Sequence, residues 1–382
     1  MTLIVTVVMF LVMVSLHEFG HFIVGRLLNF KILEYAIGFG PTIFSRQRGE
    51  VKYSIRAVPL GGYCKFEGED EDSKDQRAFS NQAVWKRILV VAAGGIFNII
   101  LGFMIFVIVV ASTSPMLTNT VDTVVEHSYI EDAGIIPGDK IVEINGKKIS
   151  FYDDITLYTS EFSKDTDAVV TVKRDGEKLS FSIRPTEQII TYTYQADGVN
   201  VSSSINGYET SEFVPYSEEN PKGEAADGEV QTVTRYIIGF SPLQKNVTIL
   251  NVWGQAWNET RFVVKLVYRS LWDMVTGKIG VDQMAGPVGI VSEVNNAVNS
   301  GSRSWLYVIN LVGLLTINLG VFNLLPIPAL DGGRLFFMII ELIRRKPIPP
   351  EKEGMVHAVG MLLLFALIIF VSFNDVMRLI GK

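Results

Sequence analysis

The sequence contains a single cysteine, Cys64, and this scarcity excludes several kinds of protein. One cysteine cannot form an internal disulfide, and it fits none of the spacings by which cysteines bind metals. We expect Cys64 to be a small packed residue. Charged residues are also sparse, at 19% of the chain, and the basic ones are scattered rather than clustered. This distribution argues against binding to nucleic acid.

Hydrophobic sequence, in contrast, is abundant: 48% of the residues are hydrophobic, and the mean hydropathy is +0.29. The apolar residues gather in four runs at 1–25, 88–112, 305–325 and 355–373. Each run is close to the roughly 20 residues that cross a bilayer. The first run lacks the basic flank and the cleavage site of a removable signal peptide, so we expect it to be retained. The sequence predicts a polytopic α-helical membrane protein with four transmembrane helices and one inserted soluble domain.

The first hydrophobic run contains the motif HEFGH at 17–21. On a helix, His17 and His21 project from one face, and two imidazoles so placed can bind one zinc ion. Glu18 can take a proton from a zinc-bound water. A charged residue at the centre of a membrane helix costs about 2.5–3.5 kcal/mol on insertion scales, so such residues usually mark a function. The alternative is a chance motif of hydrogen-bonded core residues, which would leave three polar groups in need of partners in lipid.

A catalytic zinc site typically has three protein ligands and one open position. The third ligand must reach the depth of His17, which lies about 25 Å along its helix at 1.5 Å per residue. The same depth on the third run falls near its C-terminal end, where the sequence reads NLLPIPALDGG at 323–333. Proline interrupts a regular helix there, from Pro326 on, and Asp331 follows with two glycines that permit close approach. We predict Asp331 as the third ligand, the alternative being an N-cap for a helix over 333–346.

Lysine and arginine in the short loops predict the orientation in the membrane. They are frequent in the loop after the first run and in the loop after the third, so both loops are expected to be cytoplasmic. The soluble domain and both termini then lie outside the cytoplasm, and the metal site lies near the cytoplasmic side of the inner (cytoplasmic) membrane. The acidic segment EGEDEDSKD at 67–75 is expected to be a solvated loop.

HEFGH in a first membrane helix, paired with NLLPIPALDGG in a later one, resembles the site-2 protease family of intramembrane zinc metalloproteases, and within it the bacterial RseP type. The resemblance covers most of the chain, through GFGP at 38–41, VPLGGYCKFEGE at 58–69, GPVGI at 286–290 and FNDVMRL at 373–379. It implies proteolysis within the transmembrane segments of single-pass membrane proteins, such as anti-sigma factors or signal-peptide remnants.

The resemblance also implies roles for individual residues. The zinc ligands would be His17, His21 and Asp331. Glu18 would be the catalytic acid and base, transferring a proton to the leaving amine. Asn323 would contact the substrate backbone near the scissile bond, in the same broken helix end as Pro326.

A strand edge is predicted in the loop after the first helix. GFGP carries Gly38 and Gly40, and VKYSIRAVPLGGYCKF at 51–66 is typical of two short strands around Pro59 and Gly61–Gly62. A helical substrate must unwind before it is cut, and an exposed edge can take up an extended chain by β-augmentation. We therefore expect membrane-associated β-hairpins with substrate contacts at Gly38 and Gly40, the alternative being a hairpin that only shapes the cleft.

The polar stretch resembles a PDZ domain in the pattern AGIIPGDKIVEING, where Asn145–Gly146 is a strong hairpin signal. RYIIGF at 235–240 resembles a carboxylate-binding loop placed at the C-terminal end, as in circularly permuted bacterial forms. The residues 187–234, rich in Ser, Tyr, Glu and Gly, are expected to be an insert that forms a mobile or elaborated loop. The domain either binds the new C-terminus of a precut substrate or filters substrates by size, and we favour the filter.

Four parts are therefore predicted. They are an N-terminal transmembrane pair with a cytoplasmic re-entrant hairpin loop at 1–112, an extracytoplasmic PDZ-like α+β domain at 119–245, an amphipathic membrane-surface segment at 246–302, and a C-terminal transmembrane pair at 303–382. The third part depends on the helical pattern at 248–278, in which basic residues interrupt apolar ones. His127 and His357 lie in no metal pattern and are expected to be structural.

The alternative function is a membrane divalent-metal transporter that uses the same His and Asp residues. A transporter would not require Glu18 and would have no function for the PDZ-like domain. A non-catalytic scaffold is a third possibility, and the complete set of ligands and base argues against it.

Overall fold

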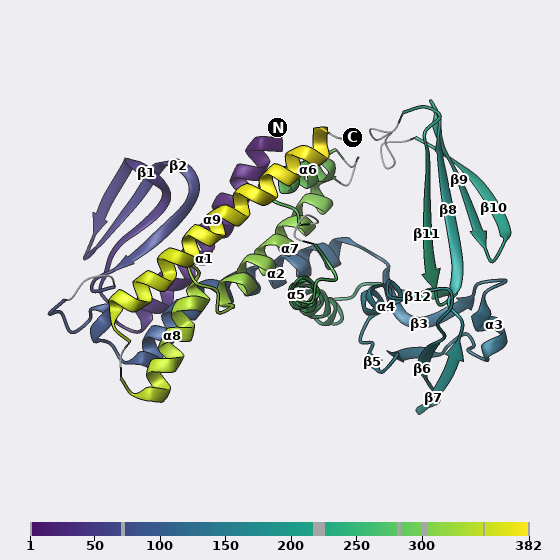
Figure 1. Ribbon diagram of the computed structural model, residues 1–382, viewed down its shortest axis with the longest axis horizontal. Coiled ribbons are helices and arrows are strands. Elements are labelled where there is room, and N and C mark those ends of the chain that lie inside the picture. The colour runs from purple at the N-terminus through teal and green to yellow at the C-terminus, as the bar shows by residue number, and fades with distance from the viewer. Residues whose placement is uncertain are drawn as a thin grey trace. The chain divides into compact units, whose positions relative to one another are not determined.

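The computed structural model describes residues 2–69, 73–216, 226–280, 284–299, 301, 304–346 and 348–380. The chain divides into two compact units (Figure 1). The first consists of Met1–Phe106, Glu259–Asn299 and Trp305–Lys382, and the second of Val107–Asn258 with Ser300–Ser304. Each unit has its own hydrophobic core.

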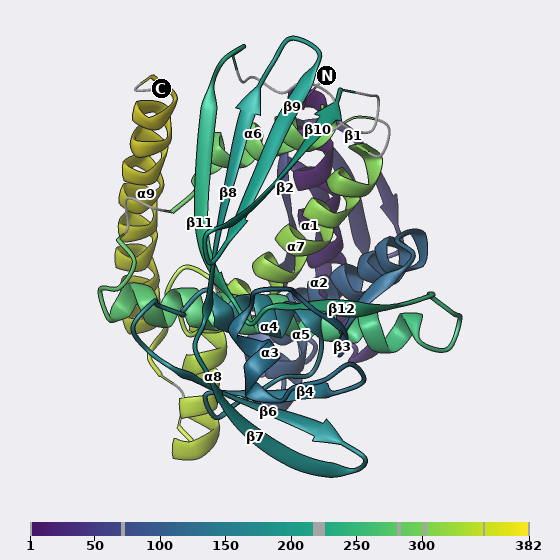
Figure 2. The same cartoon turned by 90° about the vertical axis from the view of Figure 1, so that its right-hand side faces the viewer.

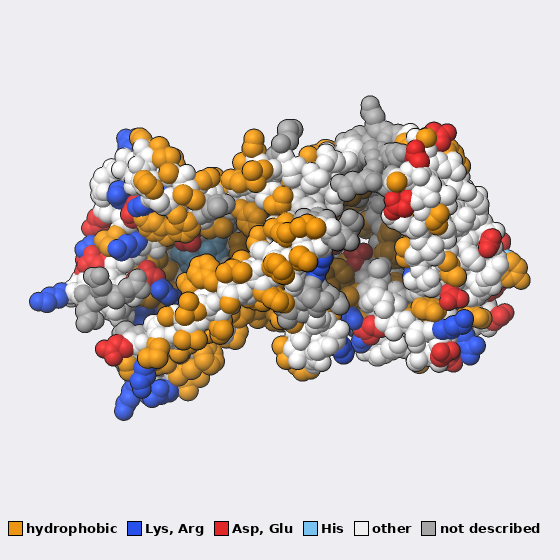
Figure 3. Space-filling view, turned by 45° about the horizontal axis from the view of Figure 1, so that its top comes forward, with side chains coloured by type: hydrophobic (Ala, Val, Ile, Leu, Met, Phe, Trp, Pro, Cys, Tyr) orange, Lys and Arg blue, Asp and Glu red, His pale blue; other side chains and the backbone are white. Residues whose placement is uncertain are grey.

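Among the described residues, four helices are long and apolar enough to cross a membrane, as the four hydrophobic runs predict. They are α1 (Thr2–Leu27), α2 (Val84–Ser112), α7 (Ser304–Leu324) and α9 (Pro350–Ile380). Hydrophobic side chains cover the face of the long helices seen in Figure 3. Because lipid accepts such a surface, the helices can leave apolar residues unburied that a soluble protein would cover.

Buried positions on α1 follow the helical repeat. Met9, Met13 and His17 are four residues apart and buried, whereas Ile4, Val8 and Val12 are exposed. Residues four apart share one face of a helix. The face that carries the HEFGH histidines is therefore the face that α1 turns toward the rest of the first unit.

Glycines let α2 and α7 approach closely. A Cβ at Gly95 would lie 2.8 Å from the carbonyl oxygen of Gly320, and one at Gly102 would lie 3.1 Å from that of Gly313. Small residues at such positions are the usual means by which membrane helices pack. Other helices are η1 (Phe79–Asn81), α5 (Val252–Val275), α6 (Pro287–Val298) and α8 (Asp331–Arg344).

Strands β1 (Ile32–Arg48) and β2 (Val51–Phe66) form a sheet of their own. Ile37 pairs with both Ile55 and Gly62, so the first part of β1 lies between the two halves of β2. The two short strands predicted over 51–66 are thus two halves of one strand that pair with β1 separately. In the described residues no other strand pairs with the half that begins at Gly62, which leaves one of its edges without a strand partner.

The second unit contains a sheet of five main strands in the order β12-β3-β4-β6-β7, with β5 paired to β4. Asn145 and Gly146 both have positive φ, 48° and 76°, in the predicted turn between β4 and β5. Ile141, Val170 and Val172 are fully buried in its core. The elements are β3 (Met116–Val124), α3 (Tyr129–Ala133), β4 (Lys140–Ile144), β5 (Lys147–Lys148), α4 (Tyr152–Thr159), β6 (Ala168–Arg174), β7 (Glu177–Ile183) and β12 (Phe240–Lys245).

The insert is a second sheet of this unit rather than a loop, which corrects the expectation for 187–234. Its strands are β8 (Thr186–Tyr194), β9 (Gly198–Ile205), β10 (Tyr208–Pro215) and β11 (Val230–Ile237), in the order β10-β9-β8-β11. Figure 2 shows them extending together as one long fan. β-Branched and aromatic residues alternate in these segments and favour strands. This preference outweighs the polar composition, from which an irregular segment was expected. Residues 217–225 of the insert lie outside the described residues.

Candidate metal centre

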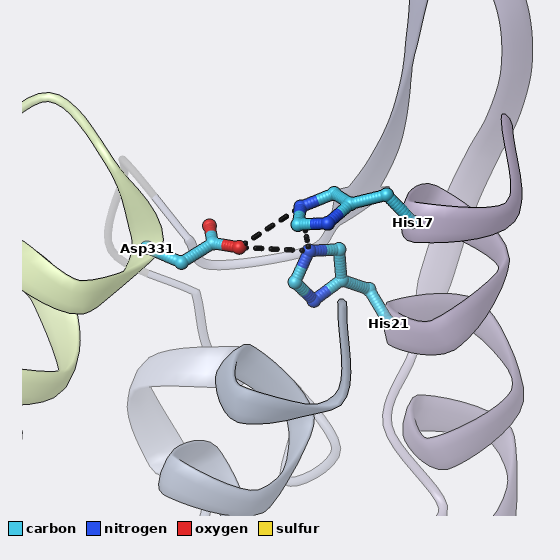
Figure 4. Close-up of side chains that lie close together, drawn as sticks. All are labelled: His17, His21 and Asp331. Carbon is cyan, nitrogen blue, oxygen red and sulfur yellow. Dashed lines mark hydrogen bonds and ion pairs between the residues drawn. The ribbon is translucent and has the colours of Figure 1, made fainter. Parts of the chain in front are cut away.

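Three potential ligands from distant parts of the sequence meet in the first unit. Asp331 Oδ2 lies 3.0 Å from His17 Nε2 and 3.2 Å from His21 Nε2, and the two Nε2 atoms are 3.2 Å apart (Figure 4). Both histidines are buried on α1, and Asp331 is the first residue of α8. Among the described residues, this is the cluster of His, Cys, Asp and Glu able to hold a metal ion.

Helix α2 fixes how the two imidazoles are oriented. His21 Nδ1 lies 2.9 Å from the carbonyl oxygen of Val90. Since a carbonyl only accepts, Nδ1 carries the proton and Nε2 of the neutral ring has a free lone pair. His17 Nδ1 lies 3.3 Å from the side-chain amide of Asn98, whose buried oxygen has no hydrogen-bond partner in the part of the chain that the structure describes. Rotating the Asn98 amide by half a turn exchanges its oxygen and nitrogen, and the oxygen then accepts from His17 Nδ1–H and leaves Nε2 unprotonated in the same way.

The donor set fits a zinc ion. Two unprotonated nitrogens and a carboxylate oxygen face one another, and the buried Asp331 Oδ2 has no hydrogen-bond partner among the described residues. Three lone pairs that face one another in a buried site repel one another, and a cation placed between them removes this repulsion. Two ligands about 2.0–2.1 Å from a tetrahedral ion lie roughly 3.3 Å apart, close to the separations observed. His, His and Asp is also a ligand type that suits zinc.

Space for the imidazoles depends on Gly94 of α2. A Cβ there would lie 2.6 Å from His21 Cε1 and 2.7 Å from His17 Cε1. The sequence interpretation missed both Gly94 and Asn98. An Asn within a hydrophobic run was the available signal, because polar residues in membrane helices usually have functional partners.

A strained loop between α7 and α8 places Asp331. Ala329 has φ +77°, a left-handed conformation that costs a residue with a Cβ about 1–2 kcal/mol. A Cβ at Gly332 would collide with the carbonyl of Leu325, which agrees with the close approach expected of this glycine. The N-cap of α8 is Leu330, so Asp331 does not take the alternative capping role. Its carboxylate is directed at the histidines instead.

Glu18 lies between the histidines and the unpaired edge of β2. Its carboxylate interacts with the backbone N–H of Cys64, and its Cγ is 3.5 Å from the position of a Cβ on Gly62. Burial, and then the nearby Glu18 carboxylate, raises the pKa of the Cys64 thiol. The thiol therefore stays protonated, as expected of a packed residue.

The predicted substrate-contacting residues occupy two places. Asn323 Nδ2 donates to the carbonyl of Leu319 at 2.9 Å, so one end of the amide satisfies its own helix. Pro326 is exposed just beyond the end of α7. Gly38 and Gly40 have φ +86° and +83°, values that glycine adopts without strain, in the middle of β1.

The acidic segment at 67–75 is a partly exposed loop in its described part, as expected, and it also forms ion pairs. Glu67 and Asp75 lie 2.5 and 3.0 Å from Lys31 Nζ. Glu69 pairs with Arg334, one turn after Asp331 on α8. The loop therefore holds the start of α8 as well as the base of the hairpin. Asp70, Glu71 and Asp72 lie outside the described residues.

Comparison with known proteins agrees with this chemistry. The profile of Peptidase family M50 matches residues 5–367. The chain belongs to peptidase family M50. A Clostridium acetobutylicum protein that bears the provisional name zinc metalloprotease is 33% identical over 375 residues, which cover 98% of this chain and 97% of that protein.

Two named members of the family are also similar along their whole length. The regulator of sigma-W protease RasP of Bacillus subtilis is 29% identical, and the zinc metalloprotease RasP of Bacillus licheniformis is 28% identical. In both cases 99% of each chain is covered. This M50 chain is a membrane protein and a zinc metallopeptidase, of the site-2 protease family that its motifs resemble.

Proposed function

We propose that this peptidase hydrolyses peptide bonds within the transmembrane segments of single-pass membrane proteins. The observation that carries the proposal is the position of Glu18, on a membrane helix, between three converging metal ligands and a strand edge without a strand partner. A transporter site needs the ligands but has no use for a carboxylate beside a peptide-binding edge. The lipid bilayer is therefore the medium in which the enzyme meets its substrate.

His17, His21 and Asp331 would hold the zinc ion. Zinc, when bound, supplies a Lewis acid that activates a water and polarises the scissile carbonyl. Glu18 accepts the proton of the attacking water and returns it to the leaving amine. Val90 and Asn98 keep both imidazoles in the tautomer that presents Nε2.

The edge of β2 would bind the substrate in extended form. Peptide groups of a helix are already hydrogen-bonded, so the substrate must unwind, and a strand edge replaces the bonds that are lost. Glu18 lies close to the backbone of β2 at Gly62 and Cys64, which supports binding of the substrate at this part of the strand. Asn323 and Pro326, at the end of α7, and Gly38 and Gly40, in β1, would flank the extended chain.

The name of one relative supports the proposed substrate class. The name of the Bacillus subtilis relative states that it regulates sigma-W. We place this chain in regulated intramembrane proteolysis, with anti-sigma factors or signal-peptide remnants as substrates. The basic loops support an orientation in which the metal centre would lie near the cytoplasmic side of the inner membrane and the PDZ-like domain outside the cytoplasm.

The PDZ-like domain would act as a size filter. A groove of about 640 Å³ lies between α4 and residues 236–240, and Gln188 and Arg235 of the insert sheet also line it. The insert makes the domain bulkier without filling that groove. A substrate with a large outer domain would be excluded by this bulk.

The test uses the full chain, purified in detergent, and a single-pass substrate with a truncated outer part. Glu18→Gln should lower the cleavage rate by about 10²–10⁴-fold, the usual contribution of a general base, while zinc content stays unchanged. Glu293→Gln, at an exposed position on α6, is the matched control and should cleave normally. Cleavage by Glu18→Gln at the wild-type rate would rule out this mechanism.

A further inference from the structure

The polar side chain of His357 on helix α9 contacts the metal-ligand loop between α7 and α8. The backbone N–H of Ala329 donates to His357 Nδ1 at 3.0 Å. Ala329 is two residues before Asp331, in the loop that connects α7 to α8. His357 lies outside every metal-binding pattern, so the sequence alone does not connect it with the metal centre.

The Ala329 N–H belongs to the most strained residue of this loop. Its φ of +77° lies in the left-handed region, which residues with a Cβ rarely adopt. Such conformations persist only where the surroundings hold them in place. The hydrogen bond to His357 is one such restraint, and it acts directly on the strained residue.

Packing fixes the imidazole from the other side. The position of a Cβ on Gly333 would be 3.1 Å from His357 Cε1, so the ring fits closely against the start of α8. One turn further along α9, the position of a Cβ on Gly360 would be 2.9 Å from the carbonyl carbon of Pro328. The ring of Phe337 lies 5.9 Å from that of His357, centroid to centroid. The loop and the start of α8 therefore pack against α9 at two positions, His357 and Gly360.

The direction of the hydrogen bond defines the chemical role of the ring. A backbone N–H can only donate, so Nδ1 must be the unprotonated nitrogen and Nε2 carries the proton. Nε2 is buried and has no hydrogen-bond partner among the described residues, and the nearest carboxylate, that of Glu353, is 3.9 Å away. The function of the side chain is thus to supply an acceptor at the δ position.

We propose that His357 is a positioning residue for the metal centre: by accepting the Ala329 N–H it holds the strained loop that directs Asp331 toward His17 and His21. This inference rests on the proposed zinc site and assigns α9 a part in forming it. It predicts that zinc affinity depends on an acceptor at the δ position of residue 357 and on little else about that side chain.

The test compares side chains with and without such an acceptor. The amide oxygen of Asn lies at the δ position and that of Gln one bond further out, so the two variants are equally polar but differ in reach. His357→Gln should weaken zinc binding by about 10–100-fold, the usual effect of losing a group that orients a ligand, whereas His357→Asn should stay within about threefold of wild type. Zinc affinity is measured by competition with a chelator on the full chain in detergent. Leu362→Ala, at an exposed site on α9, controls for general effects on the helix.

A second variant isolates the strain. Ala329→Gly removes the penalty of positive φ, so in that background His357→Gln should lose less than about threefold in affinity. Equal zinc binding by His357→Gln and wild type, or equal losses in both backgrounds, would overturn the positioning role. If wild type itself fails to bind zinc in competition, the proposed metal centre fails, and that result is distinct from failure of the role of His357.

Discussion

His21 Nδ1 and the carbonyl oxygen of Val90 lie 2.9 Å apart, so a backbone group of α2 sets the tautomer of a histidine on α1. No side-chain substitution removes that carbonyl. The equivalent contact of His17 is made by a side chain, that of Asn98. The orientation of His17 can therefore be changed by replacing Asn98. The orientation of His21 depends on a backbone group, which a side-chain substitution leaves in place.

Replacing Asn98 should affect metal binding without touching a ligand. Asn98→Leu removes the acceptor for His17 Nδ1–H, and groups of this kind contribute about 10–100-fold to metal affinity or activity. We expect a loss of that size in zinc affinity, measured by chelator competition. Asn318→Leu is the matched control, since Asn318 is a second Asn in a membrane helix whose oxygen lacks a partner among the described residues. Equal losses in both variants would indicate a general effect on helix packing.

A methyl group at Gly94 should displace the histidines. The Cβ of Gly94→Ala would lie within 2.7 Å of His17 Cε1, and the adjoining element is a helix that cannot easily move. We expect loss of zinc and a fall in cleavage of about 10²-fold or more, since small misplacements of catalytic groups have effects of this size. Gly254→Ala on α5, where a Cβ meets nothing within 4 Å, should be neutral or slightly stabilising. Normal zinc content in Gly94→Ala would show that the rings can shift aside.

Stability of the second unit should depend on pH through Asp139. Burial alone would raise the pKa of this carboxyl, but hydrogen bonds from Arg174, at 2.7 Å from each carboxylate oxygen, lower it below the usual value. A lowered folded-state pKa adds stability that is fully present above the unfolded pKa, about 3.9, and is lost as the pH falls further through the folded value. Urea unfolding followed by circular dichroism should show this loss below about pH 4.

Asp139→Asn should remove that part of the pH dependence and destabilise the unit at neutral pH. Asp139 is 1% exposed, and breaking the charge-assisted hydrogen bonds that a buried carboxylate accepts typically costs about 1–3 kcal/mol. The exposed pair Lys147–Glu161 offers the control: its nitrogen and oxygen are 2.6 Å apart, yet Lys147→Met should change stability by less than about 1 kcal/mol. Comparable effects of both substitutions would mean that burial does not determine how much an ion pair contributes to the free energy of unfolding.

Cleavage should respond to the helix propensity of the substrate. If binding at the β2 edge requires unwinding, Ala→Gly near the scissile bond removes about 1 kcal/mol of helix stability and raises kcat/KM by roughly fivefold per substitution. The measurement is a substrate series that differs only at these positions. The same substitutions two turns away serve as the control. A flat series would mean that unwinding does not limit the reaction.

Periodicity was enough to predict much of this structure. Hydrophobic runs of bilayer length located α1, α2, α7 and α9, because the length needed to cross lipid is fixed by geometry. The i, i+4 spacing placed His17 and His21 on one face, and the depth of Asp331 brought it near them.

Other features depend on which helices and strands pack against one another. A single sequence does not contain this information. Asn98 and Gly94 matter only because α2 lies against α1 at those residues. The double pairing of Ile37 in β1 follows from the fold of the sheet rather than from its alternation of residues. The insert was expected to be irregular from its polar composition, yet its strands pair with one another over their full lengths.

The ligands also differ in when they are made. A ribosome synthesises His17 and His21 about 300 residues before Asp331, so the nascent chain has two of these side chains for a long stretch of synthesis before it has the third. The cluster of the three side chains therefore exists only after the segments that separate them in the sequence have been made and have folded.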